Sequence, residues 1–106
     1  MTDEEFNAYV EAQLKRCEDT FRAKCPEYAD TADDRLSAFR AAADLQGVGT
    51  LQAITGMMAK HTVSVYKMAR EESRDLDLWR EKITDHINYL LMLEAVVELE
   101  LEAVDE

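Results

Sequence analysis

A helical pattern of apolar residues runs between Asp77 and Leu101, where the sequence reads DLWREKITDHINYLLMLEAVVELEL. Apolar residues recur there at helical spacing, which predicts an amphipathic helix that is the longest element of the chain. These residues are Trp79, Ile83, Ile87, Leu90, Val97 and Leu101. Acidic residues without any Lys or Arg fill the turns from Glu94 to Glu106. Because negative charge is unfavourable at the C-terminal end of a helix dipole, we expect about residues 100–106 to fray.

A second amphipathic pattern opens the chain and predicts a helix from Asp3 to about Lys24 with Thr2 as its N-cap. Its apolar stripe consists of Phe6, Val10, Leu14, Cys17 and Phe21. We expect this helix to stop before Pro26, because the residue that precedes a proline avoids helical backbone.

Two further helices are predicted after a polar loop over residues 27–33. The first runs from Asp34 to Leu45 and is closed by Gly47, because glycine readily adopts the left-handed conformation that follows a helix. The second runs from Leu51 to about Arg70, with Thr50 as its N-cap. Their inward positions are predicted to be Leu36, Phe39, Ala43, Ile54, Met58, His61, Val65 and Met68.

Length and composition agree with these patterns. A chain of 106 residues is the size of one domain, residues 1–106, and one Pro with three Gly leaves little material for turn-rich β architecture. The sequence therefore predicts an all-α fold, a four-helix bundle. The apolar stripe of the last helix is longer than a monomer of this size can easily cover, so we also expect a homo-oligomer that uses the long helices.

The net charge narrows the class of partner. Twelve Lys and Arg stand against 23 Asp and Glu, which gives a formal charge of −11. Such a chain repels polyanions at long range, so direct binding of nucleic acid or of an anionic membrane is not expected. Because no run approaches the roughly 20 apolar residues of a spanning helix and the N-terminus is acidic, we expect a cytoplasmic protein.

Acidic residues are absent between Leu45 and Arg70, the segment that holds all three glycines. The turn from Gly47 to Thr50 opens a helix that carries cationic side chains, and a helix N-terminus with nearby cations suits an anion such as phosphate. The cations, with the neighbouring histidine, are Lys60, His61, Lys67 and Arg70. An apolar central helix that tolerates few charges explains the same pattern, and the sequence leaves both interpretations open.

Oxygen ligands line one face of the last helix. Glu81, Asp85 and Asn88 lie at i, i+4 and i+7, and stacked oxygens of this kind are what Mg²⁺ requires from a protein. The alternative is structural: a partly buried Asp85 that pairs with Lys82 or with Lys60 across helices.

Four motifs carry a resemblance to a known family. They read K-x-x-E-Y at Lys24–Tyr28, D-R-L-x-x-F at Asp34–Phe39, K-H-x-x-S at Lys60–Ser64 and K-I-T-D-H-I-N-Y-L-L at Lys82–Leu91. Over roughly residues 17–99 the chain resembles small phage and prophage proteins related to the MazG-like all-α nucleoside triphosphate pyrophosphohydrolases, particularly the nucleotide modification associated domains.

This resemblance implies a MazG-like bundle that dimerises or tetramerises and binds a nucleotide with Mg²⁺ between its helices. Asp85, Asn88 and Tyr89 match the D-x-x-N-Y run of the family, and Lys60 falls where the family keeps a basic residue. The sequence departs from the family where its E-x-x-D motif reads Lys82-x-x-Asp85, and the upstream E-x-x-E motif is missing.

Two functions follow from these observations. The first is a nucleotide-binding protein, and if it is an enzyme, an Mg²⁺-dependent nucleoside triphosphate pyrophosphohydrolase with a degenerate metal site; no catalytic residue is assigned. Its nucleotide-binding residues would be Lys24, Tyr28, Arg35, Lys60, His61 and Ser64, and its metal ligands Glu81, Asp85 and Asn88. The second is a non-catalytic phage anti-defence protein in the host cytoplasm, which sequesters a nucleotide second messenger or acts on a host defence protein as an acidic nucleic-acid mimic, as an anti-CRISPR does.

Overall fold

The computed structural model describes the backbone of residues 1–28 and 36–105 and the side chains of residues 1–24 and 36–102. Within these ranges the chain forms four α-helices and no strand, so the expected all-α fold is confirmed. The helices are α1 (Asp3–Tyr28), α2 (Ser37–Gln46), α3 (Thr50–Arg70) and α4 (Leu76–Asp105). None of the described helices is both long enough and apolar enough to span a membrane.

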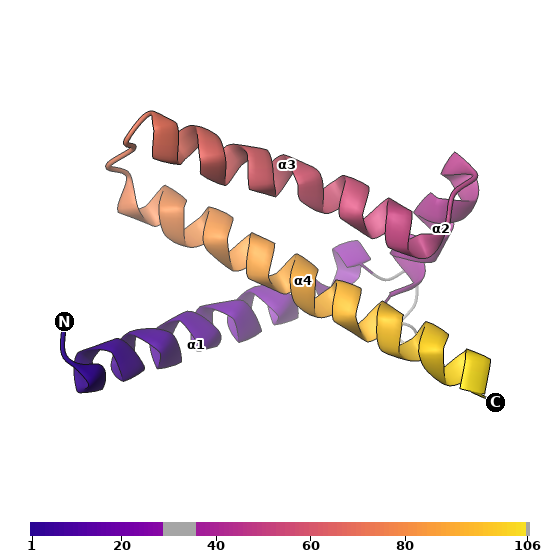
Figure 1. The fold of residues 1–106 in the computed structure, drawn as a ribbon, viewed down its shortest axis with the longest axis horizontal. Coiled ribbons are helices and arrows are strands. Elements are labelled where there is room, and N and C mark those ends of the chain that lie inside the picture. The colour runs from indigo at the N-terminus through magenta and orange to yellow at the C-terminus, as the bar shows by residue number, and fades with distance from the viewer. Residues whose placement is uncertain (29–35, 106) are drawn as a thin grey trace.

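The helices form an open arrangement rather than a closed bundle (Figure 1). α3 and α4 are antiparallel neighbours, α2 lies at the far end of α3, and α1 crosses α4. The N-terminal part of α1 extends away from α4, and residues 1–12 are all exposed. The Cα radius of gyration is 16.0 Å, whereas a compact chain of this length has about 13 Å.

The core lies where α2, α3 and α4 meet. Phe39, Ile54, Met92 and Val96 form its buried cluster, and half-buried side chains pack around them. The surrounding side chains are Phe21, Leu36, Leu51, Met57, Tyr89 and Leu93. The inward face predicted for the helix over residues 51–70 is correct, because Ile54, His61 and Met68 are buried in α3.

The glycine expected to close the second helix does so. Gly47 has φ +70°, and the amide of Val48 donates to the carbonyl of Ala43 at 3.0 Å while that of Gly47 donates to Asp44 at 3.3 Å. This pair of bonds is the Schellman motif, and its positive φ explains why a glycine occupies the position.

Three predicted helix ends need correction. α1 does not stop before Pro26 but continues to Tyr28. A proline loses its own N–H bond and its ring crowds the carbonyl four residues earlier, but the residues that follow it can stay helical. α2 begins at Ser37, later than expected, and residues 34–35 lie outside the described range. The N-cap of α3 is Gly49 rather than Thr50: its backbone is extended, and its N–H donates to Oε1 of Gln52 at 3.2 Å.

α4 begins at Leu76, one residue earlier than predicted, because the carboxylate of Asp75 accepts the Leu78 N–H at 3.0 Å and so caps the helix. The backbone of α4 is helical as far as Asp105. Fraying of this acidic end stays a prediction.

The apolar stripe predicted for α4 is not its buried face. Ile83, Leu90 and Leu101 are 39%, 48% and 60% exposed, and the other members of the stripe are half-buried. The buried face instead carries Thr84, Asp85, Asn88, Met92 and Val96. The polar members of this face can be buried because hydrogen bonds to α1 engage Thr84, Asp85 and Nδ2 of Asn88, as described below.

The stripe of α1 is also largely uncovered. Phe6, Val10 and Leu14 are 56%, 37% and 58% exposed. Of the stripe, only Cys17 is buried and Phe21 half-buried. The first half of this stripe is exposed because α1 diverges from α4 towards its N-terminus (Figure 1).

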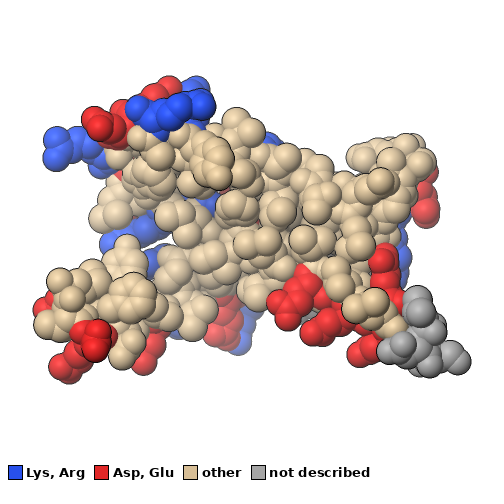
Figure 2. Space-filling model, viewed as in Figure 1, with Lys and Arg blue, Asp and Glu red and all other residues tan. Residues whose placement is uncertain are grey.

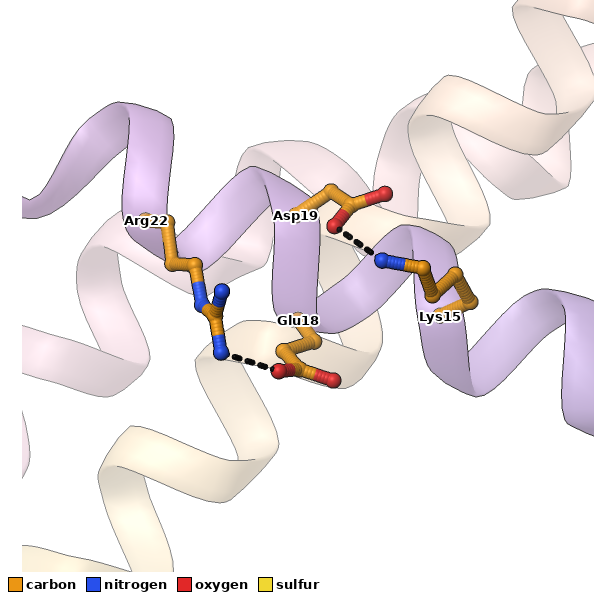
Figure 3. Close-up of polar contacts among 4 residues, drawn as sticks. All are labelled: Lys15, Glu18, Asp19 and Arg22. Carbon is orange, nitrogen blue, oxygen red and sulfur yellow. Dashed lines mark hydrogen bonds and ion pairs between the residues drawn. The ribbon is translucent and has the colours of Figure 1, made fainter.

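Ion pairs along its own surface support the second half of α1, on its exposed side (Figure 3). Lys15 pairs with Asp19 at 3.0 Å, and Arg22 pairs with Glu18, both at i, i+4 spacing. Thr2 and Glu5 add a reciprocal cap: the amide of Glu5 donates to Oγ1 of Thr2, and the amide of Thr2 donates to Oε2 of Glu5. Thr2 is thus the N-cap, as predicted, and such local contacts are each worth a few tenths of a kcal/mol to about 1 kcal/mol.

Candidate functional site

A polar cleft of about 510 Å³ lies between α1 and α4. The lining residues recur at helical spacing along α1 and along α4, which places each set on one face of its helix. The lining residues are Arg16, Asp19, Thr20 and Lys24 from α1, and Asp77, Arg80, Glu81, Thr84 and Asp85 from α4. The cleft therefore gathers three cations, four carboxylates and two hydroxyl groups.

An ion pair between Lys24 and Asp85 joins the two walls. The ammonium Nζ lies 3.1 Å from Oδ1 of the carboxylate, and the Asp85 side chain is only 9% exposed against 35% for Lys24. A carboxylate that is buried to this degree needs a neutralising partner, and Lys24 supplies it. The structural alternative predicted that Asp85 pairs with Lys60 or Lys82. Asp85 is indeed paired with a lysine, but that lysine is Lys24 of α1, which lies 61 positions earlier in the chain.

Further hydrogen bonds hold α1 against the polar face of α4. The amide Nε2 of Gln13 donates to Oγ1 of Thr84 at 2.9 Å, and its Oε1 accepts two bonds from Arg16 at 3.0 and 2.8 Å. Nδ2 of Asn88 donates to the carbonyl of Cys17 at 3.2 Å. Together with the Lys24–Asp85 ion pair, these bonds join α1 to α4 at three points and hold the two walls of the cleft together.

His61 lies behind the cleft on α3, where its ring is tilted against that of Tyr89 with centroids 4.9 Å apart. Burial lowers the pKa of His61 below its ordinary value of 6.5, and this outweighs the nearby Asp85 carboxylate, which raises it. The charges of Lys60, Lys82 and Lys24 lower it further. His61 is thus held neutral, and it is electrostatically linked to both members of the cleft's ion pair.

This shift makes stability depend on pH. The folded state resists protonation of His61. The contribution of neutral His61 to the free energy of unfolding is therefore fully present above pH 6.5, and it is lost as the pH falls through the lowered pKa of the folded state. We expect the free energy of unfolding, measured by urea denaturation, to decline on acidification within this window. In His61→Gln the decline should be shallower, and parallel curves for the two proteins would contradict this assignment.

The structure brings together some of the residues that the sequence singled out. Lys24, Glu81 and Asp85 line one cleft. Lys60 is exposed and Ser64 half-buried on α3, and neither is among the residues that line it. The side chains of Tyr28 and Arg35 lie outside the described residues.

Asn88, the third predicted metal ligand, lies deeper than the cleft. It is 1% exposed, and its Oδ1 has no hydrogen-bond partner among the described residues. Sequence reasoning missed Arg16, Thr20 and Arg80. The available signal was weak: Arg16, Thr20 and Lys24 repeat at i, i+4 and i+8, on the face beside the apolar stripe of the same helix.

A Mg²⁺ ion takes several oxygen ligands around one point. Among the described residues, no group of three or more His, Cys, Asp or Glu is placed to hold a metal ion. Asp85, the most buried carboxylate of the cleft, is engaged by Lys24. As arranged, these residues do not form a cage for a resident divalent cation, and the magnesium site stays a prediction.

Comparisons with known protein families, with curated proteins and with solved structures found no match to this chain. The resemblance to MazG-like proteins stays a hypothesis that rests on the four quoted motifs.

Proposed function

We propose that the protein binds a nucleotide in the polar cleft between α1 and α4. The observation that carries this proposal is that Arg16, Lys24 and Arg80 line one cleft, beside four carboxylates, so that the cleft offers cations for phosphate groups in a chain whose net charge is −11. Guanidinium and ammonium groups are the usual protein partners of phosphate, and a partly enclosed site strengthens their attraction. A volume of about 510 Å³ is within the range of small-molecule sites.

The other groups of the cleft suit the remainder of a nucleotide. Thr20 and Thr84 offer hydroxyl groups that can both donate and accept, and Glu81 offers a carboxylate that accepts from ribose hydroxyls or from base amino groups. The motifs that resemble the MazG-like family support the same class of ligand, because Lys24 and Asp85 belong to two of them. We propose binding without a hydrolytic step, since the most buried carboxylate of the cleft, Asp85, is paired with Lys24.

The test is calorimetric titration of the protein with ATP, with and without MgCl₂. We expect Arg16→Met to weaken the affinity by about 10- to 30-fold, the effect of losing one charge-assisted contact. The matched control is Lys60→Met, which removes one positive charge from α3 outside the cleft and should change the affinity less than about twofold.

The reverse pattern, with binding retained in Arg16→Met and lost in Lys60→Met, would place the nucleotide on α3. Absence of binding by the unsubstituted protein would favour a second candidate function, an acidic anti-defence protein of a phage. One observation favours that candidate: Glu94, Glu98 and Glu102 are exposed at i, i+4 and i+8 on one edge of α4. Such a row can present regularly spaced negative charge to a basic groove.

A further inference from the structure

The three cations of the polar cleft are not equally available to a ligand. Lys24 is paired with Asp85 at 3.1 Å, so its charge is already compensated. Arg16 donates from Nε and Nη2 to Oε1 of Gln13, a neutral acceptor that leaves the positive charge of Arg16 in place. No carboxylate of the described residues forms an ion pair with Arg16. Arg16 therefore keeps its charge and the donors of Nη1 for a ligand.

Arg80 is the second cation with donors to offer. Within the described part of the chain, none of its N–H groups donates a hydrogen bond, and its buried Nε has no partner. Its Nη1 lies 3.8 Å from Oδ1 of Asp77, which is too long for a hydrogen bond, and the Asp77 side chain is 96% exposed. A pair of this kind at the surface contributes little. Arg80 thus offers a planar guanidinium, and phosphate oxygens match its geometry.

Hydrogen bonds place these two arginines at the same part of the cleft. Thr84 follows Arg80 by one helical turn on the same face of α4. Oγ1 of Thr84 accepts from Gln13 of α1, and Gln13 in turn holds Arg16. Arg16 and Arg80 therefore approach the cleft from opposite walls, one from each helix. Two guanidinium groups on either side of a cavity can hold one phosphate group between them.

The carboxylates of the cleft limit how much negative charge it can take. Two of the four are paired with lysines, at 3.0 and 3.1 Å, and the others are the exposed Asp77 and Glu81. A phosphate monoester carries a charge of about −1.5 to −2 at pH 7, which two guanidinium groups balance. A second phosphate group would add negative charge beside Asp77 and Glu81, while the remaining cation of the described lining, Lys24, is already paired.

The surface around the cleft also disfavours a longer phosphate chain. Figure 2 shows Asp and Glu gathered along α1 and along the C-terminal half of α4, the two helices that form the cleft. Exposed charges within a Debye length of a ligand, about 10 Å at 0.1 M salt, still repel it. A phosphate group beyond the reach of the two arginines therefore gains no attraction.

We propose that the polar cleft recognises a single phosphate group, held between Arg16 and Arg80, so that its ligand class is the nucleoside monophosphates. This inference rests on the proposed function, and it adds which cations hold phosphate and how many phosphate groups the site recognises. ATP still binds through one of its phosphate groups, but its longer chain brings no gain in affinity.

Calorimetric titration without MgCl₂ tests the inference with four probes: adenosine, AMP, ATP and inorganic phosphate. We expect AMP to bind about 30-fold more tightly than adenosine, because only AMP makes charge-assisted hydrogen bonds to the two arginines. ATP should bind within about threefold of AMP. Inorganic phosphate should bind about 30-fold more weakly than AMP, because it lacks the hydrogen-bonding groups of the nucleoside.

Arg80→Met should abolish the preference for AMP over adenosine. We expect it to weaken AMP by about 10- to 30-fold and to change adenosine by less than about twofold. Arg80→Lys keeps the charge but not the planar group, so it should recover part of the loss. The matched control is Arg22→Met on α1, because Arg22 pairs with Glu18 at the surface and does not line the cleft. It should leave the affinity for AMP within about twofold.

The outcomes separate this inference from the proposed function. ATP binding about 10-fold or more tightly than AMP would overturn the inference and leave the proposed function standing. Equal weakening of AMP and adenosine in Arg80→Met would also overturn it, because Arg80 would then act on the nucleoside or on the fold. Inorganic phosphate as tight as AMP would overturn the nucleotide as ligand, and absence of binding by all four probes would overturn both proposals.

Discussion

Ile54→Ala is expected to lower the free energy of unfolding by about 4 kcal/mol, because it opens a cavity where the side chain is now fully enclosed. Ile54 is 0% exposed and belongs to the cluster that joins α2, α3 and α4. In a chain of this size the loss corresponds to a fall in the melting temperature of about 20 °C. Urea denaturation monitored by helical circular dichroism measures it.

Val63→Ala is the control for this substitution, because Val63 lies on the same helix and is 63% exposed. It should cost less than about 0.5 kcal/mol. If Ile54→Ala cost as little as Val63→Ala, the core would not lie where these helices meet.

Lys24→Asp is expected to have the second large effect. It replaces the cation of a partly buried ion pair by a second carboxylate beside Asp85, and breaking such a pair costs about 3–5 kcal/mol when the remaining charge is buried. Because Lys24 is 35% exposed and can be reached by solvent, we expect the lower end of this range. The same denaturation experiment measures it.

Exchange of the two charges separates an electrostatic cost from a packing cost. The double variant Lys24→Asp with Asp85→Lys restores the ion pair, and it should recover about half of the stability that Lys24→Asp loses. Lys15→Asp is the control, because Lys15 is an exposed lysine of α1 whose pair with Asp19 lies at the surface. A double variant no more stable than Lys24→Asp would contradict the pairing.

Local features of the chain were predictable because they depend on neighbouring residues. The four helices follow from apolar spacing, and the stop at Gly47 follows from the freedom of glycine at positive φ. Ile54 and Met68 could be placed inside because the apolar stripe of α3 is the face that its contacts with α2 and α4 bury.

The roles of the α1 and α4 stripes could not be predicted in the same way. Periodicity shows that Val10 and Leu90 belong to apolar faces, but it does not show whether the chain itself or a second molecule covers them. Burial of Thr84 and Asp85 depends on Gln13 and Lys24, which lie 71 and 61 positions earlier. Such pairings are tertiary, and no local pattern encodes them.

In the candidate site, too, the sequence identified some residues correctly and misplaced or missed others. The motifs pointed to Lys24 and Asp85 and the helix-face spacing pointed to Glu81, and these three residues do line one cleft. The motifs also pointed to Lys60, which is exposed and outside the residues of that cleft, because a position on a helix face does not reveal which neighbour that face meets. Arg16 was missed for the same reason.

The central claim, that the cleft between α1 and α4 holds a nucleotide, is tested most directly by mapping ATP on the protein with ¹H–¹⁵N correlation spectra. If it is right, the backbone amide signals of Arg16, Thr20, Lys24 and Thr84 shift together and saturate at one dissociation constant, while those of Val63 and Tyr66 on α3 do not move. Absence of any shift, or shifts confined to the α3 segment from Gly49 to Lys60, would contradict it.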